Sequence, residues 1–413
     1  MADITNGSQF RHTTGSRPGP VPNRRFDVLQ VHNRYRDPGG EDAVVAAERE
    51  VLTAAGHRVA VHDVQNPSGS LAAAGALALS PWNPVSALAL GRVINTHRPE
   101  LAHVHNTWYS LSSSVLSTLR RRRIPTVMTM HNYRATCLNG QLFRDGAVCQ
   151  LCLGRPPLPG IRYRCYRGSL PASLAVAGAV GIERWLGLWE GAVELFVVMT
   201  EFSRLLLAAA GLPGHRVRVK PHFVADRGRR SGQPSASDTV LFVGRLSSEK
   251  GVDQLVEAWS QAETADLTLR IVGDGPLRAA LEQRRVAGVD VAGWLGPDRV
   301  AEELRSARAL VVPSIWYEPF GLVLIEGMAA GLPIVASAIG GIPEVVGDVD
   351  PAFLPGAGDV ADWSASLSRL AVSGEELDAA GAASRRRYEH RYTPELGLAA
   401  LEQIYSETLT LSG

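Results

Sequence analysis

The chain has 413 residues, of which 45% are apolar and 20% are charged. This length exceeds what one hydrophobic core usually serves, and it predicts two domains of ordinary size. The formal net charge of +1 excludes a whole-molecule attraction to nucleic acid or to an anionic membrane, so any anion recognition has to be local. The local basic clusters are residues 120–123 and Arg162, Arg164 and Arg167, and solvated helix ends or loops explain both.

The first 25 residues are rich in Gly, Pro, Ser and Arg and lack the apolar core of a signal peptide. They predict a disordered tail on a protein that is not exported, and hence a cytoplasmic location. The two most apolar segments are 71–94, interrupted by Pro81 and Pro84, and 170–199, interrupted by charged residues such as Glu183 and Arg184. Neither segment predicts a membrane span.

Residues 26–225 show strands alternating with helices. Buried strands are predicted at 25–33, 100–106, 125–131 and 194–200, and helices at 112–123 and 171–190. After the first strand, a turn at Gly39 and Gly40 opens an amphipathic helix that stops at Gly56 and is followed by a further strand. This alternation predicts a parallel sheet with helices on both faces.

Residues 226–237 are polar and suit an interdomain linker. A second alternation occupies 238–390, with strands predicted at 239–245, 267–273, 290–294, 309–314 and 333–337, and helices at 251–262, 276–287 and 298–307. Helices continue from 361, and we expect those of 391–413 to pack back on the N-terminal domain. The fold class is therefore α/β, with two parallel-sheet domains facing a central cleft, and ligands of such folds bind at the carboxyl ends of the strands.

Three loops after predicted strands carry candidate binding residues. Gly39 and Gly40 can let backbone N–H groups approach an anion or a sugar, although a tight turn explains them equally well. Arg245 and Lys250 could neutralise a diphosphate or be plain surface cations, and the position of Arg245 at the end of its strand favours the first interpretation. His131 also ends a strand, but a lone histidine is more often a structural hydrogen-bonding residue than a catalyst.

Two glutamates stand eight residues apart in the stretch EPFGLVLIEG. Pro319 and Gly321 keep Glu318 out of the following helix, so its carboxylate can lie near the free N–H groups of the helix N-terminus. Glu326 would lie within that helix, at most roughly 12 Å away. The two carboxylates of a glycoside hydrolase are only ~5 to 9.5 Å apart. Glu318 and Glu326 are therefore predicted to hold opposite parts of one long ligand.

The longer stretch EPFGLVLIEGMAAGLPIVAS resembles the E-x7-E signature of the retaining GT-B glycosyltransferases of family 4, the glycogen-synthase-like superfamily. Other motifs of that family stand here in the same order, namely GGED, HVHNTW, VGRLSSEKGVDQLVEAW, IVGDGP and GGIPEVV. The resemblance covers nearly everything from residue 26 onward. It implies two Rossmann-like domains, of which the N-terminal one binds the acceptor and the C-terminal one the donor.

The resemblance also implies an activity. A sugar would pass from a UDP- or GDP-linked donor to a hydroxylated acceptor, either a natural product or a cell-envelope glycan or glycolipid, by a metal-independent front-face mechanism that retains configuration. Glu318 and His131 would contact the donor sugar, Glu326 the ribose, and Arg245 and Lys250 the diphosphate. The further donor contacts that it implies are Gly39, Gly40, Gly244, Gly293, Trp294, Leu295, Phe320, Gly321 and Leu322.

The remaining predictions concern cofactors, partners and alternatives. No cofactor is expected for catalysis, because the Asp-x-Asp triplet at 348–350 lies in a Pro/Gly-rich loop. The arginine clusters favour an anionic acceptor or weak membrane association, whereas the poor span signals favour a soluble acceptor. A GT-B epimerase, a phosphorylase without an evident pyridoxal-phosphate lysine, and a catalytically silent auxiliary protein are alternatives. A nicotinamide dehydrogenase is disfavoured, since no G-x-G-x-x-G follows the first strand.

All four cysteines of the chain lie in one insert after the strand that ends at His131. They are Cys137, Cys149, Cys152 and Cys165, and four thiolates could form a tetrahedral structural zinc site. Disulfides are disfavoured in the cytosol, so zinc is predicted ahead of plain reduced cysteines. The position of the insert makes it a candidate lid over the acceptor.

Overall fold

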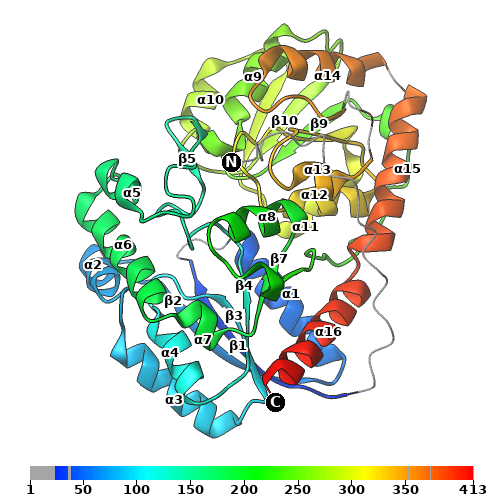
Figure 1. Ribbon diagram of the computed structural model, residues 1–413. Coiled ribbons are helices and arrows are strands. Elements are labelled where there is room, and N and C mark those ends of the chain that lie inside the picture. Colours follow the sequence, from blue (N-terminus) through cyan, green and yellow to red (C-terminus); the bar gives the residue numbers. More distant parts are fainter. Residues whose placement is uncertain (1–23, 36–38, 349, 351–352, 373, 413) are drawn as a thin grey trace. The chain divides into compact units, whose positions relative to one another are not determined.

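A computed structural model of the protein describes residues 24–35, 39–348, 350, 353–372 and 374–412. Nearly all of the expected tail, residues 1–25, therefore lies outside the described residues. The chain forms two compact units, shown in Figure 1, and each unit is built on a parallel sheet of its own. The N-terminal unit contains residues 24–142, 149–221 and 395–412, and the C-terminal unit contains 143–148 and 222–394.

The N-terminal unit is built on a six-stranded sheet in the order β2-β1-β3-β4-β7-β8, and every neighbouring pair is parallel. Its strands are β1 Asp27–Arg34, β2 Arg58–Gln65, β3 Leu101–Asn106, β4 Thr126–Thr129, β7 Leu195–Val198 and β8 Val217–Val219. Its helices are α1 Gly40–Ala54, α2 Ser70–Ala78, α3 Pro84–His97, α4 Ser114–Arg121, α5 Leu158–Arg162, α6 Leu170–Trp185, α7 Leu188–Ala192, α8 Glu201–Ala209 and α16 Pro394–Ser412. The short strand β8 was not among the predicted strands.

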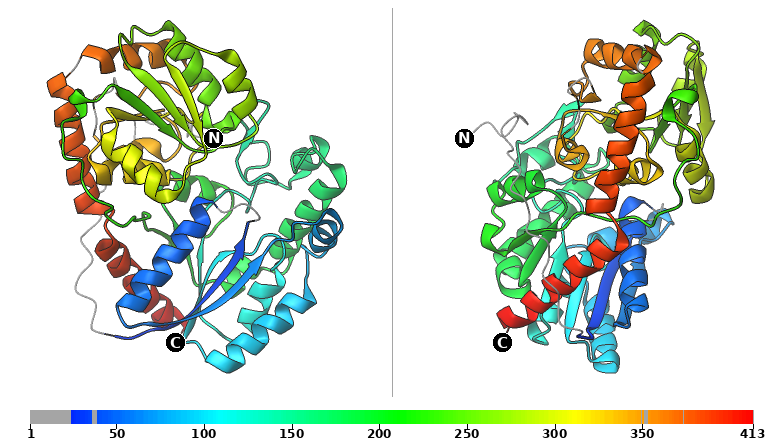
Figure 2. Two further views of the ribbon diagram at one scale, coloured as in Figure 1. Left: turned by 180° about the vertical axis from the view of Figure 1, so that it is seen from behind. Right: turned by 90° about the vertical axis from the view of Figure 1, so that its right-hand side faces the viewer.

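Helices from opposite ends of the chain pack together in this unit. Leu52 of α1 and Leu401 and Tyr405 of α16 share one apolar core with Phe26 and with inward side chains of the sheet. In Figure 2, α16 lies alongside this sheet. Every residue of β3 is buried, as expected for a central parallel strand covered on both faces.

The helix predicted over 171–190 is interrupted in the structure. α6 ends at Trp185 and α7 begins at Leu188. Between them, Gly187 adopts a left-handed conformation with a φ of +57°. Glycine takes this conformation without the steric penalty that other residues meet, and helices commonly end at such a residue. The single long helix was therefore a wrong prediction.

The C-terminal unit is built on a five-stranded parallel sheet in the order β11-β10-β9-β12-β13. Its strands are β9 Thr239–Val243, β10 Thr268–Val272, β11 Val289–Gly293, β12 Ala309–Val312 and β13 Ile334–Ala336. Its helices are α9 Val252–Gln261, α10 Arg278–Arg284, α11 Pro297–Ser306, α12 Leu322–Ala330, α13 Ile342–Val346, α14 Val360–Val372 and α15 Gly374–Arg391. Residues 143–148 add a small antiparallel hairpin, β5 Phe143–Arg144 and β6 Ala147–Val148. The predicted α/β class with two parallel sheets is confirmed.

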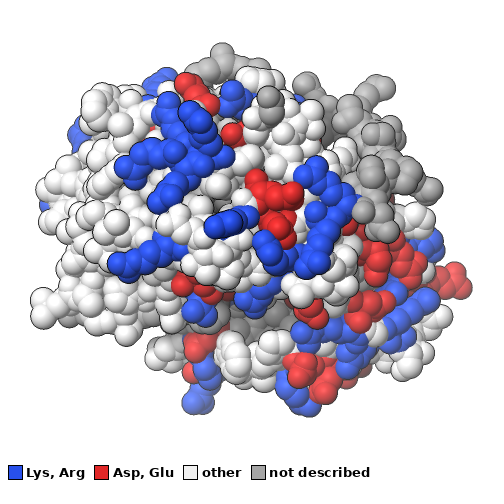
Figure 3. Space-filling view, turned by 90° about the horizontal axis from the view of Figure 1, so that it is seen from below, with Lys and Arg blue, Asp and Glu red and all other residues white. Residues whose placement is uncertain are grey.

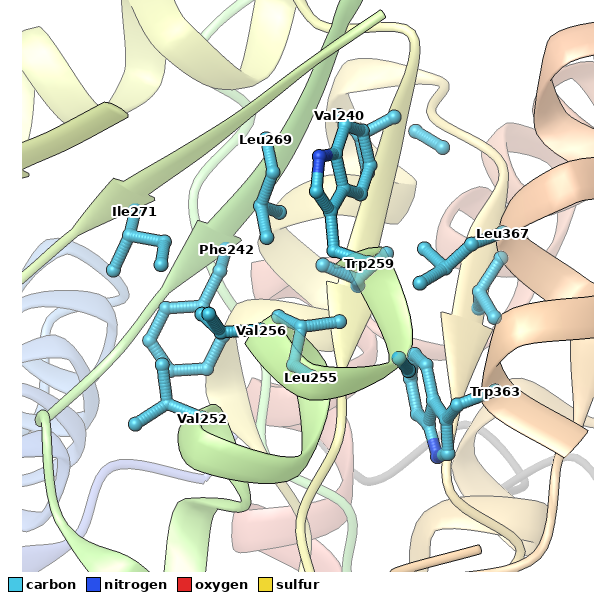
Figure 4. Close-up of a cluster of buried hydrophobic side chains, with 14 of the residues drawn as sticks. Val240, Phe242, Val252, Leu255, Val256, Trp259, Leu269, Ile271, Trp363 and Leu367 are labelled. Atoms are coloured by element: carbon cyan, nitrogen blue, oxygen red, sulfur yellow. The ribbon is translucent and has the colours of Figure 1, made fainter. Parts of the chain in front are cut away.

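The core of this unit shows how its sequence pattern becomes packing (Figure 4). The buried face of α9 repeats at intervals of three and four residues, which keeps it on one side of the helix. It packs against alternate residues of β9 and β10 and against α14. The labelled residues are Val252, Leu255, Val256 and Trp259 of α9, Val240 and Phe242 of β9, Leu269 and Ile271 of β10, and Trp363 and Leu367 of α14. Each such side chain contributes about 1.5–3 kcal/mol when it is removed from water.

The near-neutral net charge conceals local patches. On the face drawn in Figure 3, Lys and Arg side chains gather in several places, some of them beside acidic side chains. Across the part of the chain that the structure describes, no helix combines the length and apolarity needed to cross a bilayer.

Candidate active site

The C-terminal unit presents Lys250 on the loop that follows β9. The loop closes in a single 3-10 turn, Ser248–Lys250. Gly251 follows with a φ of +69°, and a Cβ there would lie 1.9 Å from the carbonyl oxygen of Pro313. Only glycine fits so close to another backbone. The loop is therefore held against the segment after β12, and Lys250 is brought next to the residues of that segment.

Glu318 belongs to the segment after β12 and is buried, with 6% of its surface exposed. Its Oε2 accepts three hydrogen bonds, from Nζ of Lys250 at 2.6 Å, from Nε1 of Trp316 at 3.0 Å and from Oγ of Ser314 at 3.1 Å. The Lys250 ammonium also lies 5.2 Å from the centroid of the Trp316 ring, within the range of a cation–π contact. A buried carboxylate is stable only when it is paired in this way.

The backbone around Glu318 is held by a second glycine loop, Gly340 and Gly341. The N–H of Gly341 donates to the carbonyl oxygen of Glu318 at 2.8 Å. Gly340 has a φ of +61°, and a Cβ on it would lie 2.6 Å from the Glu318 nitrogen. The Gly340-Gly341 turn of the motif GGIPEVV therefore packs directly against the backbone of Glu318.

Helix α12 begins directly after this segment, at Leu322. Gly321 caps it with a φ of +85°, so the predicted break between Glu318 and the helix is present. The ring of Phe320 is buried and lies edge-on to His222 at 5.1 Å and to Tyr392 at 5.9 Å between ring centroids. Its side chain therefore belongs to the core.

Glu326 is carried by α12, within its second turn. Part of the Glu326 side chain is exposed to solvent. The protein around its carboxyl is nevertheless dense enough for burial to raise the pKa of that carboxyl, and the charge of Arg227 opposes this rise. A carboxyl in this position can accept hydrogen bonds from hydroxyl groups of a ligand.

The other predicted donor-side residues of this unit occupy two loops. Arg245 follows Gly244 and is exposed. A Cβ at Gly273 would lie 1.9 Å from the carbonyl oxygen of Gly244, so the loops after β9 and β10 touch. At the end of β11, Gly293 is buried, and the loop continues with Trp294 and Leu295. The Trp294 side chain is 70% exposed.

In the N-terminal unit, the Gly39-Gly40 turn is tied to the end of β1. The N–H of Gly39 donates to Oδ2 of Asp42 at 2.9 Å, and Oδ1 of Asp42 lies 2.9 Å from Nε2 of His32. Burial alone would raise the pKa of Asp42, but the hydrogen bonds from His32 and from the Gly39 backbone lower it overall. Gly40 is exposed and is the first residue of α1.

His131 follows β4 and is half-buried. Its Nε2 lies 3.2 Å from Nδ1 of His105, and the two rings are stacked with their centroids 5.5 Å apart. Burial lowers the pKa of His131 well below its ordinary value, and His32, His103 and Lys220 lower it further. His131 is therefore a neutral imidazole near pH 7, with one ring nitrogen that donates and one that accepts.

Two family models match this chain. A model of glycosyltransferase family 4 matches residues 38–226, and a model of group 1 glycosyl transferases matches residues 237–372. Together they take in most of the chain. It belongs to glycosyltransferase family 4. The GT-B signature identified from the sequence is thereby confirmed, and the protein is a glycosyltransferase.

Two relatives extend this finding. The chain is 27% identical over 298 residues to a 2-deoxystreptamine glucosyltransferase of Streptomyces kanamyceticus, covering 65% of this chain and 74% of the relative. It is 27% identical over 359 residues to a 2-deoxystreptamine N-acetyl-D-glucosaminyltransferase of Streptomyces fradiae, covering 83% and 80%. Among solved structures, HepE of Anabaena in complex with UDP-glucose matches with a TM-score of 0.63 at 16% identity, over 93% of this chain and 100% of the other. This last likeness confirms the GT-B fold of the family 4 chain.

The structure brings some of the predicted site residues together. Lys250 and Glu318, 68 residues apart in sequence, are in direct contact, and Gly321 separates Glu318 from the helix that carries Glu326. The predicted partners of Glu318 were the N–H groups of the helix N-terminus, whereas its observed partners are side chains. Ser314 and Trp316 were not predicted, although both stand next to Glu318 in the stretch SIWYEP.

Sequence reasoning also missed a buried group of charged and polar side chains in the N-terminal unit. Lys220 Nζ lies 2.8 Å from Oε1 of Glu48, and Oε2 of Glu48 lies 3.6 Å from Nε2 of His105 and 3.7 Å from Nδ1 of His103. A signal was available, because Glu48 lies on the same face of α1 as buried Val44, Val45 and Leu52. The two histidines of HVH also lie in a strand that is buried on both faces.

The same group contains side chains that metals prefer. Among the described residues, the ligand atoms that gather within 4.8 Å of one another are those of Glu48, His103 and His105, not those of the cysteines. Lys220 already supplies a cation to this group, so a metal ion there would meet an ammonium at short range. No disulfide joins any two of the four cysteines, all of which lie in the described residues, and burial raises the pKa of the Cys152 thiol. Zinc binding by the cysteines stays a prediction.

Proposed function

We propose that this glycosyltransferase moves a sugar from a UDP- or GDP-linked donor to a hydroxyl group of a small acceptor, with retention of configuration and without a metal ion. The observation that carries the proposal is the contact of Lys250, Ser314 and Trp316 with a single oxygen of Glu318. Among the described residues, no donor lies on the other carboxylate oxygen of Glu318. That oxygen can accept a hydrogen bond from a hydroxyl of the donor sugar.

In this proposal, charge on the departing diphosphate is neutralised by side chains. Arg245 and Lys250 stand on one loop, and 26% of the Lys250 side chain is exposed. Fixed cations of this kind stabilise charge that develops in the transition state. The bond from the sugar to the diphosphate breaks while a bond to the acceptor oxygen forms on the same face, and the departing phosphate takes the acceptor proton. Glu326 would hold the ribose, and exposed Trp294 would face the base.

Metal independence follows from the same cations. Of the Asp-x-Asp triplet, Asp350 is paired with Arg369 at 3.1 Å, which supports a structural role for that carboxylate. Transfer activity is therefore expected to survive EDTA. Loss of activity with EDTA that magnesium restores would contradict this part of the proposal.

The acceptor is proposed to be a small polyhydroxylated natural product. Support comes from the two relatives whose names specify 2-deoxystreptamine, one of which aligns with 83% of this chain. An acceptor panel should therefore pair 2-deoxystreptamine with an anionic glycolipid precursor. Transfer to the lipid alone would favour the cell-envelope alternative.

The activity is tested by incubating the protein with UDP- and GDP-sugars and measuring thermal shift, slow donor hydrolysis and transfer. A single donor should raise the melting temperature and be hydrolysed, and NMR of the product should show the anomeric configuration of the donor. Epimerised donor without transfer would favour an epimerase. Silence across all donors would favour an auxiliary protein without catalysis.

A further inference from the structure

Two long stretches of the N-terminal unit carry no charged side chain. They are residues 67–91 and residues 168–182. The first forms α2 and begins α3, and the second forms most of α6. The two stretches meet in space, because α2 packs against α6, and a Cβ placed on Gly178 of α6 would lie 3.6 Å from Cγ of Pro81, in the link from α2 to α3. In Figure 1, α2, α5 and α6 lie together at one side of this unit.

The helices of these stretches bury only one side. Val176 of α6 and Leu77 of α2 pack in one apolar core with Trp108. The other sides of the helices present large apolar side chains to solvent, and of Trp185 83% is exposed. The exposed residues are Leu71 and Leu79 at the two ends of α2, Val85 and Leu88 of α3, and Leu174 and Trp185 of α6. A single exposed apolar residue is ordinary, whereas several on adjoining helices indicate an interaction surface.

Arginines border these apolar side chains. Residues 146–182 contain no Asp or Glu, and their basic residues are Arg155, Arg162, Arg164 and Arg167. All four are exposed, and none of them forms an ion pair with any described residue. Arg167 stands three residues before α6 begins, and α5, which carries Arg162, packs against α6. We call these four arginines and the six exposed apolar residues the α2–α6 surface.

The C-terminal unit treats its arginines differently. There, exposed residues such as Arg278 and Arg299 are paired with nearby carboxylates. Such pairs leave little positive charge to attract a partner. On the α2–α6 surface the described residues leave the arginine charges uncompensated, next to apolar side chains that are also without a partner. The surface therefore suits a partner that is both anionic and apolar.

We infer that the α2–α6 surface docks on a membrane that contains anionic lipids. The exposed leucines and Trp185 enter the boundary between headgroups and acyl chains, and the arginines contact the lipid phosphates. Tryptophan favours this boundary, and an arginine can keep its charge among the headgroups while its aliphatic part lies along the apolar layer. Apolar burial and attraction to anionic lipids add to each other in such binding. The inference concerns this surface alone and does not rest on the proposed transfer reaction.

Other partners fit the surface less well. In a symmetric pair of two copies, the same patch meets itself, so arginines of one copy would face arginines of the other without acidic residues of 146–182 between them. Nucleic acid could contact the arginines, but its charged backbone would leave the leucines without an apolar partner. An anionic membrane supplies phosphate and hydrocarbon at the same face.

The first test is sedimentation of the full chain with lipid vesicles. Vesicles of phosphatidylcholine and phosphatidylglycerol in equal parts should bind the protein, and vesicles of phosphatidylcholine alone should bind it more weakly. High salt should weaken the binding to the mixed vesicles, because it screens the charges. Absence of binding to the mixed vesicles would overturn the inference, and so would equal binding to both kinds.

Charge variants locate the binding surface. Arg162→Gln/Arg167→Gln should weaken binding to the mixed vesicles about 25-fold, since each basic side chain near an anionic surface contributes about fivefold. The matched control, Arg284→Gln/Arg299→Gln, removes the same charge from exposed positions of the C-terminal unit and should bind as the wild type does. Equal losses in the two variants would show that net charge alone attracts the protein, and would overturn the assignment to this surface.

Apolar variants test whether the leucines and Trp185 enter the lipid. Leu174→Ser/Trp185→Ser should weaken binding at least about tenfold, because two large side chains lose their burial, and Val372→Ser, which changes an exposed residue of α14, should not. All these side chains are exposed, so the melting temperatures should stay close to that of the wild type. Wild-type binding by Leu174→Ser/Trp185→Ser would overturn the inference.

Fluorescence gives a readout that needs no loss of binding. Vesicles with brominated acyl chains quench a tryptophan that enters the lipid, so they should quench the wild type, and Trp185→Phe should show less quenching. Equal quenching in the two proteins would contradict the entry of Trp185. Self-association without vesicles that Leu174→Ser abolishes, together with no binding to vesicles, would assign the surface to a second copy of the chain.

Discussion

Each unit of the protein holds a lysine and a glutamate in close contact, and the surroundings of the two pairs differ. In the C-terminal unit, Lys250 lies 2.6 Å from Glu318, and 26% of the lysine side chain is exposed. In the N-terminal unit, Lys220 lies 2.8 Å from Glu48, and neither side chain is exposed by more than 1%. Under the proposed function, the partly exposed Lys250 can exchange its carboxylate for a ligand phosphate. The buried lysine cannot, so its pair can only hold other groups in place.

The difference shows that an ion pair is not a functional signal by itself. A buried pair loses hydration on both partners, and its attraction roughly offsets that loss, so removal of one partner harms folding far more than removal of both. In the Lys250–Glu318 pair, solvent reaches the lysine, and Ser314 and Trp316 also donate to the buried carboxylate, so removal of Lys250 should affect folding less. Stability and activity should therefore respond in opposite ways at the two pairs.

The largest effect is expected at the buried pair. Glu48→Ala leaves the Lys220 ammonium buried without its carboxylate, and the N-terminal unit should lose about 3–5 kcal/mol of unfolding free energy. Urea unfolding followed by fluorescence measures this loss. The matched control is Glu48→Leu/Lys220→Met, which removes both charges and should lose far less. Equal losses in the two variants would show that packing, not the unpaired charge, dominates at this site.

The next effect belongs to the open pair. Lys250→Ala removes a cation from the proposed diphosphate site, and transfer should fall about 10²- to 10³-fold. The melting temperature should change little, because Ser314 and Trp316 still donate to Glu318. Steady-state rates and thermal melts measure the two quantities. Arg299→Ala, which breaks an exposed pair with Glu302 in the same unit, is the control; wild-type turnover in Lys250→Ala would refute the assignment.

Much of the C-terminal site could be predicted from the sequence, because it is local. The EPFG stretch places Glu318 before a helix. Gly321 has a left-handed backbone conformation, and α12 begins only after it. Family resemblance then supplied the roles. The direct contact of Lys250 with Glu318 could not be predicted, since no local pattern tells which lysine approaches a carboxylate 68 residues away.

The buried group of the N-terminal unit is the opposite case. Glu48 and Lys220 are brought together only by the tertiary fold, through the packing of α1 on the sheet and the end of β8. A glutamate in AAEREV suggests a solvated helix face, and only the full spacing of the apolar residues places it inside. Sequence reasoning located His131 from its position at the end of a strand but could not see the groups beneath it.

An acid-dependent loss of stability should arise from the buried group around Glu48. The pKa of His103 is lowered to about 4 by burial, against about 6.5 in an unfolded chain. The unfolded state therefore binds the proton first, and stability present above pH 6.5 is lost as the pH falls toward 4, by up to about 3 kcal/mol.

The contribution of His103 is measured by urea unfolding of the wild type and of His103→Gln between pH 7.5 and 4.5. The unfolding free energy should fall less steeply with decreasing pH in the variant than in the wild type. The difference is needed because Glu41, whose pKa burial raises to about 8, takes up its proton in the folded state and contributes with the opposite sign. Identical slopes for the two proteins would contradict the neutral, buried state of His103.

The smallest effect is expected at Glu326. This carboxyl is half-buried on α12, and its neighbours in the helix are apolar. Because its raised pKa comes chiefly from burial, removal of the group relieves an unfavourable charge, and Glu326→Ala should not lower stability. If Glu326 holds the ribose, the variant should raise KM for the donor about tenfold, since one or two hydrogen bonds to a charged acceptor are lost, and leave kcat within a factor of about two. Glu326→Gln keeps one acceptor oxygen, so its KM for the donor should lie between those of Glu326→Ala and the wild type. A fall in kcat with unchanged KM would show that Glu326 acts in the chemical step and not in donor binding. The C-terminal unit would then contain two carboxylates, Glu318 and Glu326, that take part in catalysis.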